Sequence, residues 1–288
     1  MFHARIARYS PTMERTDLLA ALARDGAAFG DSCEEAGLVA PAESCAGWSV
    51  ADLVWHLTAV HQFWRTVVGE KLPDREGYVR PERVADADLL ATYRAGLAAT
   101  IAVLTEADPD SEVWTWSTDH TVGFVIRRLA HETAVHCWDA QVAAGAPVAV
   151  EAHLASDGID EFLTHFIGEA RADALPVDGS VHLHCGDVPG EWTLRPRAGG
   201  SAGQGAAGQG AAGQGAAGRD DPASDSRGDP GDDRGFDLTR EHAKGDCAIR
   251  GSASDILLAL WRRIPTDAVD LVGDTAMAER FIARTSLE

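Results

Sequence analysis

A succession of long amphipathic segments in the first 170 or so residues constrains this chain more than any other feature. Short loops separate the segments, and antiparallel helices connected in this way pack into a bundle. Apolar residues recur at helical spacing over five segments: Thr16–Gly37, 50–68 after a Ser49 N-cap, Ala85–Glu106, Thr121–Ala144 and Glu151–Gly168. The sequence therefore predicts a four-helix bundle at the N-terminus, with the fifth helix placed in the same part.

The pattern changes after Pro176, where short alternating segments replace the long helical ones. Three of them predict strands, a fourth predicts a further short strand, and two amphipathic stretches predict helices. The strands are expected at Ser180–Cys185, Gly190–Pro196, Asp246–Gly251 and 269–274, and the helices at 252–264 and 275–284. We therefore expect an α+β chain, with a helical bundle over residues 1–172 and a small α/β domain over 173–288.

A low-complexity tract of repeated GQGAA units and acidic residues runs from Gly199 to Gly235. It has scarcely any apolar side chains, so it cannot bury enough surface to offset the entropy of ordering. We expect a disordered insertion, without a function of its own, between two strands of the second domain.

The charge and the cysteines narrow the possible partners and compartment. A formal net charge of −20 disfavours nucleic acid and anionic membrane surfaces, both of which attract basic proteins. The five cysteines are scattered and odd in number, which is typical of reduced thiols. With no signal-peptide pattern and no expected membrane span, the sequence predicts a cytoplasmic protein whose partners are small molecules.

The stretch RRLAHETAVHCWDAQ, residues 127–141, resembles the HExxH motif of zinc proteases but holds one residue too many. Helix positions five apart diverge by roughly 140°, so His131 and His136 cannot face one ion, whereas positions four apart stay within about 40°. The protease interpretation fails because it needs both histidines on one face. The pair that remains, Glu132 and His136, needs at least one more ligand.

A further ligand is expected from another helix of the bundle, because bundle metal sites are assembled by facing helices. The second helix offers His56 and His61. His56 lies beside Leu53 and Val60 on the apolar stripe, while His61 is roughly 140° further round the helix. Periodicity alone also allows His56 to be an ordinary core residue.

The motifs GWSVADLVWHL and RRLAHETAVHCWDAQ, with the C-terminal LLALWRR and VDLVGDTAMAERFIAR, resemble the actinobacterial mycothiol-dependent maleylpyruvate isomerase family. The resemblance covers nearly the whole chain except the insertion. It implies a DinB-like bundle with a small α/β domain. It also implies a divalent metal, typically zinc, held by His56, Glu132 and His136. The chain departs from the family where Ala46 replaces the frequent proline before Gly47-Trp48.

The resemblance also implies the chemistry. Three protein ligands leave one zinc position open, and a thiol bound there loses its proton near neutral pH. With mycothiol as cosubstrate, the thiolate would add to an activated double bond, allow rotation and leave, giving cis–trans isomerisation. A substrate lacking such a bond would instead undergo S-transfer. No protein nucleophile is expected, and Cys137 is interpreted as a space-filling thiol.

Some charged residues are candidates for supporting roles. Asp139, three positions after His136, is a candidate to orient that imidazole, and a plain solvated charge is the alternative. A carboxylate-bearing substrate needs a cation, and the candidates are Arg127 with Arg128 or Arg262 with Arg263, of which we favour the second pair.

Two other functions remain open at this point. A metal-dependent hydrolase would use zinc-bound hydroxide and need no added thiol. A non-enzymatic binding module would use the ion for stability alone and need a fourth protein ligand, for which the sequence offers no obvious candidate.

Overall fold

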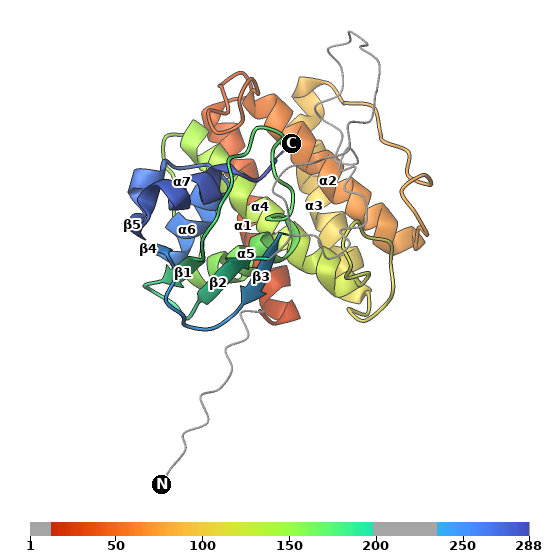
Figure 1. The fold of residues 1–288 in the computed structure, drawn as a ribbon. Helices are drawn as coiled ribbons and strands as arrows, with labels where there is room; N and C mark the ends of the chain where they lie inside the picture. The colour runs from red at the N-terminus through yellow and green to blue at the C-terminus, as the bar shows by residue number, and fades with distance from the viewer. Residues whose placement is uncertain (1–12, 198–234, 288) are drawn as a thin grey trace, which may run out of the picture. The chain divides into compact units, whose positions relative to one another are not determined.

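The computed structural model describes residues 13–197 and 235–287. The predicted disorder of 199–235 therefore falls almost wholly outside the described residues. The chain forms two compact units, and the described part of the first spans Glu14–Val150. Met13, Glu151–Arg197 and 235–287 form the described part of the second. Figure 1 shows the helices and the sheet of both units.

The first unit is a bundle of four helices, as predicted. They are α1 (Arg15–Ala36), α2 (Val50–Glu70), α3 (Asp86–Glu106) and α4 (Val122–Ala143). The helix α1 packs on α4 and α3, and α2 packs on α3 and α4. The core between them is apolar and includes the fully buried side chains Leu22, Phe29, Leu53, Leu57, Tyr93 and Ile126.

The helix α3 is long and apolar enough to cross a membrane by length and composition alone, which the sequence analysis did not expect. Its residues Leu89, Tyr93, Leu97, Thr100 and Leu104 are buried at helical spacing. Its exposed positions are mostly alanine, and the charged Arg94 among them pairs with Asp31 and Glu34 of α1. Its packing on α1 and α2 makes it a helix of the bundle.

The second unit has a five-stranded mixed sheet in the order β3-β2-β1-β4-β5. The strands are β1 (Val181–Cys185), β2 (Glu191–Pro196), β3 (Phe236–Thr239), β4 (Cys247–Gly251) and β5 (Asp270–Gly273). Only β1 and β4 pair in parallel, and the other pairs are antiparallel. The strand β3 was missed because it lies directly after the low-complexity tract and its apolar–polar alternation spans only four residues.

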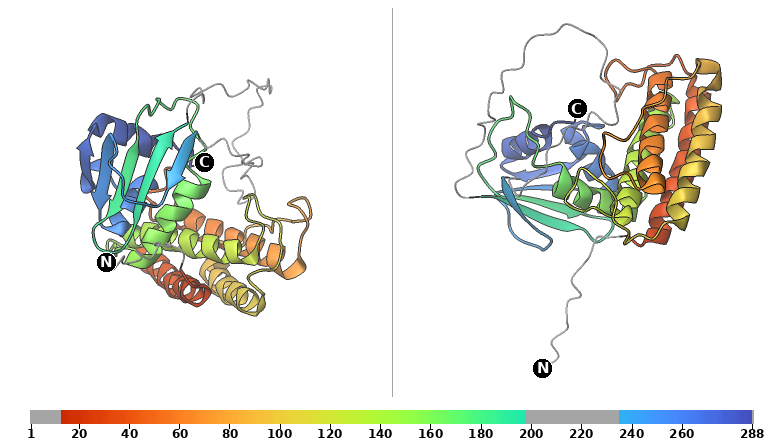
Figure 2. Two further views of the ribbon diagram at one scale, coloured as in Figure 1. Left: turned by 60° about the horizontal axis from the view of Figure 1, so that its bottom comes forward. Right: turned by 90° about the vertical axis from the view of Figure 1, so that its right-hand side faces the viewer.

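Helices α5 (Ala152–His165), α6 (Ala253–Leu260) and α7 (Thr275–Ala283) belong to this unit, together with the 3₁₀ turn η1 (Thr266–Ala268). They lie on one face of the sheet (Figure 2). The residues on that face are buried and include Val181, Leu183, Trp192, Leu194, Cys247 and Ile249. The opposite face carries the alternate residues, among them His182, His184 and Arg250.

The fifth predicted helix lies in a different unit from the one expected. We placed it in the bundle, with a boundary at 172/173, whereas the two units divide between Val150 and Glu151. The helix α5 packs on α6. Its buried carboxylate Asp160 accepts a hydrogen bond from Trp192 Nε1 in β2 and two from Arg240. These long-range contacts have no signature in the local helical pattern.

The helix α6 is shorter than predicted, ending at Leu260 rather than at 264. Arg262 has a φ of 56°, in the left-handed region, so the chain turns sharply where the pattern suggested one more helical turn.

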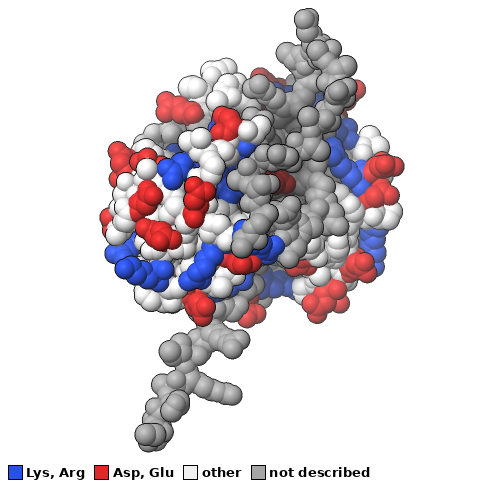
Figure 3. All heavy atoms as spheres, in the orientation of Figure 1, with Lys and Arg blue, Asp and Glu red and all other residues white. Residues whose placement is uncertain are grey.

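On the face shown in Figure 3, acidic and basic side chains of the described residues are intermingled.

Candidate metal centre

The helix α2 carries His56 two turns from a well-capped N-terminus. Ser49 and Asp52 form a capping box, in which each side chain accepts a hydrogen bond from the other residue's backbone N–H. Arg83 Nη1 donates to Asp52 at 2.6 Å. Leu53, Val60 and their neighbours are buried in the bundle, and the His56 side chain is only 17% exposed. The cap thus sets where α2 begins and which way His56 points.

The helix α4 carries the other two predicted ligands one turn apart. It begins after Thr121, whose side chain accepts a hydrogen bond from the Phe124 backbone N–H. Glu132 and His136 lie at i and i+4 on the same face, with His136 Nε2 3.3 Å from Glu132 Oε1. This arrangement follows from helix geometry alone.

The packing of α2 against α4 brings the three residues together. His56 Nε2 lies 3.1 Å from Glu132 Oε1, and the His56 and His136 rings are 4.9 Å apart between centroids. One ligand atom from each residue lies within 4.8 Å of the other two. Ligand atoms around a tetrahedral zinc are about 3.3 Å apart. The donor set, two imidazoles and one carboxylate, therefore fits a divalent metal such as zinc.

Asp139 lies where it can orient His136. His136 Nδ1 is 2.9 Å from Asp139 Oδ2, and Asp139 is buried. If Nδ1–H donates a hydrogen bond to this carboxylate and Nε2 gives up its proton, as metal binding requires, the lone pair of Nε2 points toward Glu132 and His56. Cys45 Sγ contacts the same carboxylate oxygen at 3.6 Å.

Cys45, His136 and Asp139 form a second group of potential ligands around this imidazole. It would use Nδ1 of His136, the nitrogen that the Asp139 hydrogen bond engages. Both groups contain the His136 imidazole. We favour His56, Glu132 and His136, because a metal bound by these three leaves the hydrogen bond between His136 Nδ1 and Asp139 intact.

Arg128 has a role that the sequence analysis missed. We considered it only as a possible partner for a substrate carboxylate, but it is buried and its Nη2 donates to Glu132 Oε2 at 2.7 Å. It thereby holds one carboxylate oxygen and leaves the other facing the histidines. Its spacing, four residues before Glu132, was the signal that could have revealed it.

The hydrogen bonds of the cluster decide its charge state. Burial alone raises the pKa of Glu132, but hydrogen bonds from His136 and His56 and the charge of Arg128 bring that pKa well below its usual value. Burial lowers the pKa of His136, yet contacts with Asp139, Cys45 and Glu132 raise it well above the usual value. Glu132 is therefore an ionised carboxylate, as a metal ligand must be.

The other histidines of these two helices lie outside this cluster. His61 is buried beside Thr133, with Nε2 2.9 Å from Oγ1, and burial lowers its pKa to about 3. His131 is buried as well and does not belong to the group around Glu132. Cys137 is buried, and burial raises the pKa of its thiol to about 12, so it is protonated at neutral pH.

The favoured cationic pair belongs to the other unit. Arg262 Nη1 donates to the backbone oxygen of Ala283 at 3.3 Å. Arg263 Nη1 donates to the backbone oxygen of Trp261 at 3.0 Å. These contacts are to backbone carbonyls, and the role of the pair in substrate binding stays a prediction.

Comparisons with known proteins cover both units. Residues 19–141 match the mycothiol maleylpyruvate isomerase N-terminal domain, and residues 153–280 match the MDMPI C-terminal domain. No curated protein matches the sequence. The crystal structure of the mycothiol-dependent maleylpyruvate isomerase is similar, with a TM-score of 0.52 and 10% identity over 90% of this chain and 93% of that one.

A histidine-to-alanine variant of a mycothiol-dependent maleylpyruvate isomerase is also similar in structure. Its TM-score is 0.50 and its identity 13%, again over 90% of this chain and 93% of that one. At such identities the likeness shows the fold, while the two domain matches together span most of the sequence. The chain therefore belongs to the mycothiol-dependent maleylpyruvate isomerase family, a family of enzymes.

Proposed function

We propose that this protein is a metal-dependent, mycothiol-using enzyme that acts on a small electrophilic substrate, as an isomerase or an S-transferase. Its metal ligands are His56, Glu132 and His136. The observation that carries the proposal is the convergence of these three donor atoms within 4.8 Å, from two helices that the bundle packs together. Membership of the family supports mycothiol as the thiol.

The residues around the cluster prepare it for a cation before any ligand arrives. Arg128 hydrogen-bonds to Oε2 of Glu132, and Asp139 hydrogen-bonds to Nδ1 of His136. Both of these ligand atoms point away from the cluster. Such support fixes the side-chain rotamers and reduces the ordering cost of metal binding. A divalent metal held there lowers the pKa of a coordinated thiol, so the thiol is available as a thiolate near neutral pH.

The site is partly open, as a substrate requires. The His56 and Glu132 side chains keep 17% and 21% of their surface exposed, whereas His136 keeps 9%. Trp48 lies against His56, with ring centroids 5.0 Å apart, and covers part of that imidazole. Three protein donors leave a coordination position for an exogenous thiol, which is the pattern of catalytic rather than structural zinc sites.

The test combines metal analysis with calorimetric titration of mycothiol. We expect His56→Ala to contain one equivalent of metal less than the wild-type chain and to lose mycothiol binding. His120→Ala, an exposed histidine of the same unit, is the matched control and should change neither. Chelator treatment of the wild-type chain should abolish mycothiol binding, and added Zn²⁺ should restore it.

The same preparation distinguishes the possible activities. Thiol-dependent cis–trans isomerisation of maleylpyruvate would identify an isomerase, and consumption of mycothiol with an electrophile would identify a transferase. Unchanged metal content in His56→Ala would refute the ligand assignment. Metal binding without any effect of mycothiol would instead support the hydrolase or the structural alternative.

A further inference from the structure

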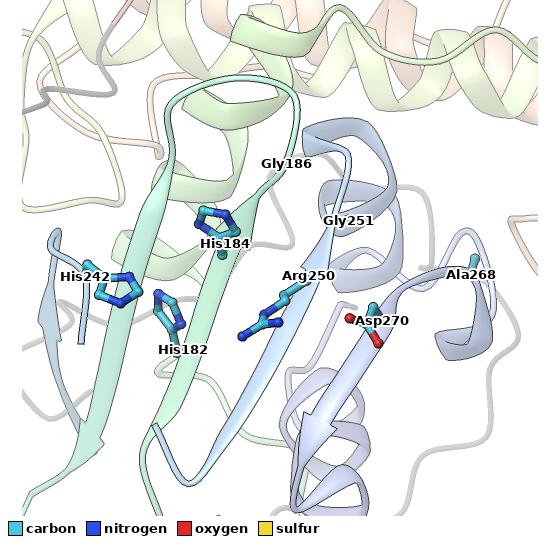
Figure 4. A pocket seen from close by; sticks show the side chains of 8 residues that line it. All are labelled: His182, His184, Gly186, His242, Arg250, Gly251, Ala268 and Asp270. Carbon is cyan, nitrogen blue, oxygen red and sulfur yellow. The ribbon is translucent and has the colours of Figure 1, made fainter. Parts of the chain in front are cut away.

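The exposed face of the sheet carries a second group of metal-ligating side chains, far along the sequence from the first. His182 and His184 lie two residues apart on β1 and share this face. Glu191 of β2 is the register partner of His184, and His242 follows β3. Figure 4 shows His182, His184 and His242 gathered above neighbouring strands.

The distances within this group match those of a metal site. One donor atom each from His182, Glu191 and His242 lies within 4.8 Å of the other two. His242 Nδ1 is 3.1 Å from Glu191 Oε1, and His184 Nδ1 is 2.6 Å from the same oxygen. The rings of His182 and His242 are 5.2 Å apart between centroids, at 89° to each other.

A separate observation points to a missing ligand. His182 is only 5% exposed, and its Nε2 is a buried atom without a hydrogen-bond partner among the described residues. A buried polar atom left unpaired is destabilising, and a bound water or ion that pairs with it removes this cost. The residue also lines an open hollow of about 610 Å³, together with His184, His242, Arg250 and Asp270.

We propose that His182, Glu191 and His242 form a second binding site for a divalent transition-metal ion such as Zn²⁺ or Ni²⁺. Zn²⁺ and Ni²⁺ bind imidazole nitrogens readily, whereas Mg²⁺ and Ca²⁺ prefer sites made of oxygen ligands alone. Two imidazole nitrogens and one carboxylate oxygen therefore favour a transition-metal ion. His184 lies against the Glu191 carboxylate, although its Nδ1 makes no hydrogen bond among the described residues. The ion would fasten the segment 240–246, which connects β3 to β4, onto β1 and β2.

The charges that face the group are mixed. Arg250 on β4 is the register partner of His184, and its positive charge opposes a cation. Asp270 on β5 is in turn the register partner of Arg250, which places a carboxylate beside the guanidinium. Glu191, in contact with two of the histidines, would repel a carboxylate or phosphate ligand, so the site favours a cation over an anion.

The experiment uses the full chain without a polyhistidine tag, stripped with a chelator and titrated with Zn²⁺ by calorimetry. All variants are made in a His136→Ala background, which removes the imidazole shared by both candidate groups of the bundle and separates the two proposals. The background chain should bind one equivalent of Zn²⁺. Adding His242→Ala should abolish this binding or weaken it at least about 10-fold, because loss of a ligand weakens binding no less than loss of a group that supports a ligand.

His153→Ala, an exposed histidine of α5 in the same unit, is the matched control and should keep the full equivalent. The His242 side chain is 77% exposed, so its replacement leaves the core intact. Hydrogen exchange of residues 240–246 should slow on Zn²⁺ addition in the background chain and stay unchanged in the His242→Ala variant. Equal Zn²⁺ affinity with and without His242, or no binding by the background chain, would overturn the proposal.

Discussion

Arg128 donates a hydrogen bond of 2.7 Å to Oε2 of Glu132, one turn further along α4, while Oε1 of that carboxylate faces His56 and His136. The guanidinium is buried, so the pair is shielded from solvent and its charges interact strongly. The arginine thus orients the central carboxylate and, together with the hydrogen bonds from His136 and His56, keeps it ionised.

Replacing Arg128 should therefore weaken metal binding without removing a ligand. We expect Arg128→Met to lower zinc affinity by about 10–100-fold, the range for groups that support a ligand. The measurement is competition against a chromophoric chelator, with circular dichroism to check folding. Arg127→Met, the adjacent arginine, is the control, and an equal loss in both variants would contradict the assigned role.

Variants of Asp139 and Cys45 distinguish between the two possible sets of metal ligands that include His136. If Asp139 orients the imidazole, Asp139→Asn should lower zinc affinity by about 10–100-fold, and Cys45→Ala should have little effect. If Cys45, His136 and Asp139 held the metal instead, Cys45→Ala would lose it and His56→Ala would keep it. Metal content of the three variants, measured side by side, decides between the groups.

The cap of α2 gives a prediction about pH. Burial raises the pKa of Asp52, but hydrogen bonds from Ser49 and Arg83 lower it by more, so its folded-state pKa lies below the ordinary value. A lowered folded-state pKa adds stability above the unfolded-state pKa of about 4, and the gain is lost as the pH falls through the folded-state value.

Asp52→Asn should therefore destabilise the chain at pH 7 and have a smaller effect near pH 3. Ser49→Ala, which removes the other half of the cap, should cost about 1 kcal/mol at neutral pH. Urea unfolding at several pH values measures both effects. Glu76→Gln, in an exposed loop, is the control, and the same pH profile for both carboxylate variants would rule out this explanation.

The hydrogen bond from Trp192 Nε1 to Asp160 ties α5 to the sheet at 2.9 Å. Trp192→Phe removes the donor from a buried carboxylate, and leaving such a group short of a partner costs about 1–3 kcal/mol. We expect a lower urea midpoint for the transition of the second unit. Unchanged stability would mean that Arg240, which also donates to Asp160, satisfies the carboxylate alone.

Local sequence determined the helices and half of the first candidate site. The caps at Ser49 and Thr121 and the helical spacing of apolar residues set the start and the buried face of α2 and α4. The i,i+4 spacing put Glu132 and His136 on one face and excluded His131. These properties depend on residues within one or two turns of each other, so they can be read from consecutive residues.

Tertiary structure decided the features that join distant segments. The sequence alone left His56 and His61 open, and the resemblance selected His56, which the packing of α2 on α4 brings to Glu132. Likewise, α5 packs with α6 rather than in the bundle, and strand register brings Glu191 beside His184. Such contacts depend on packing and register between segments far apart in the chain, and no local periodicity encodes them.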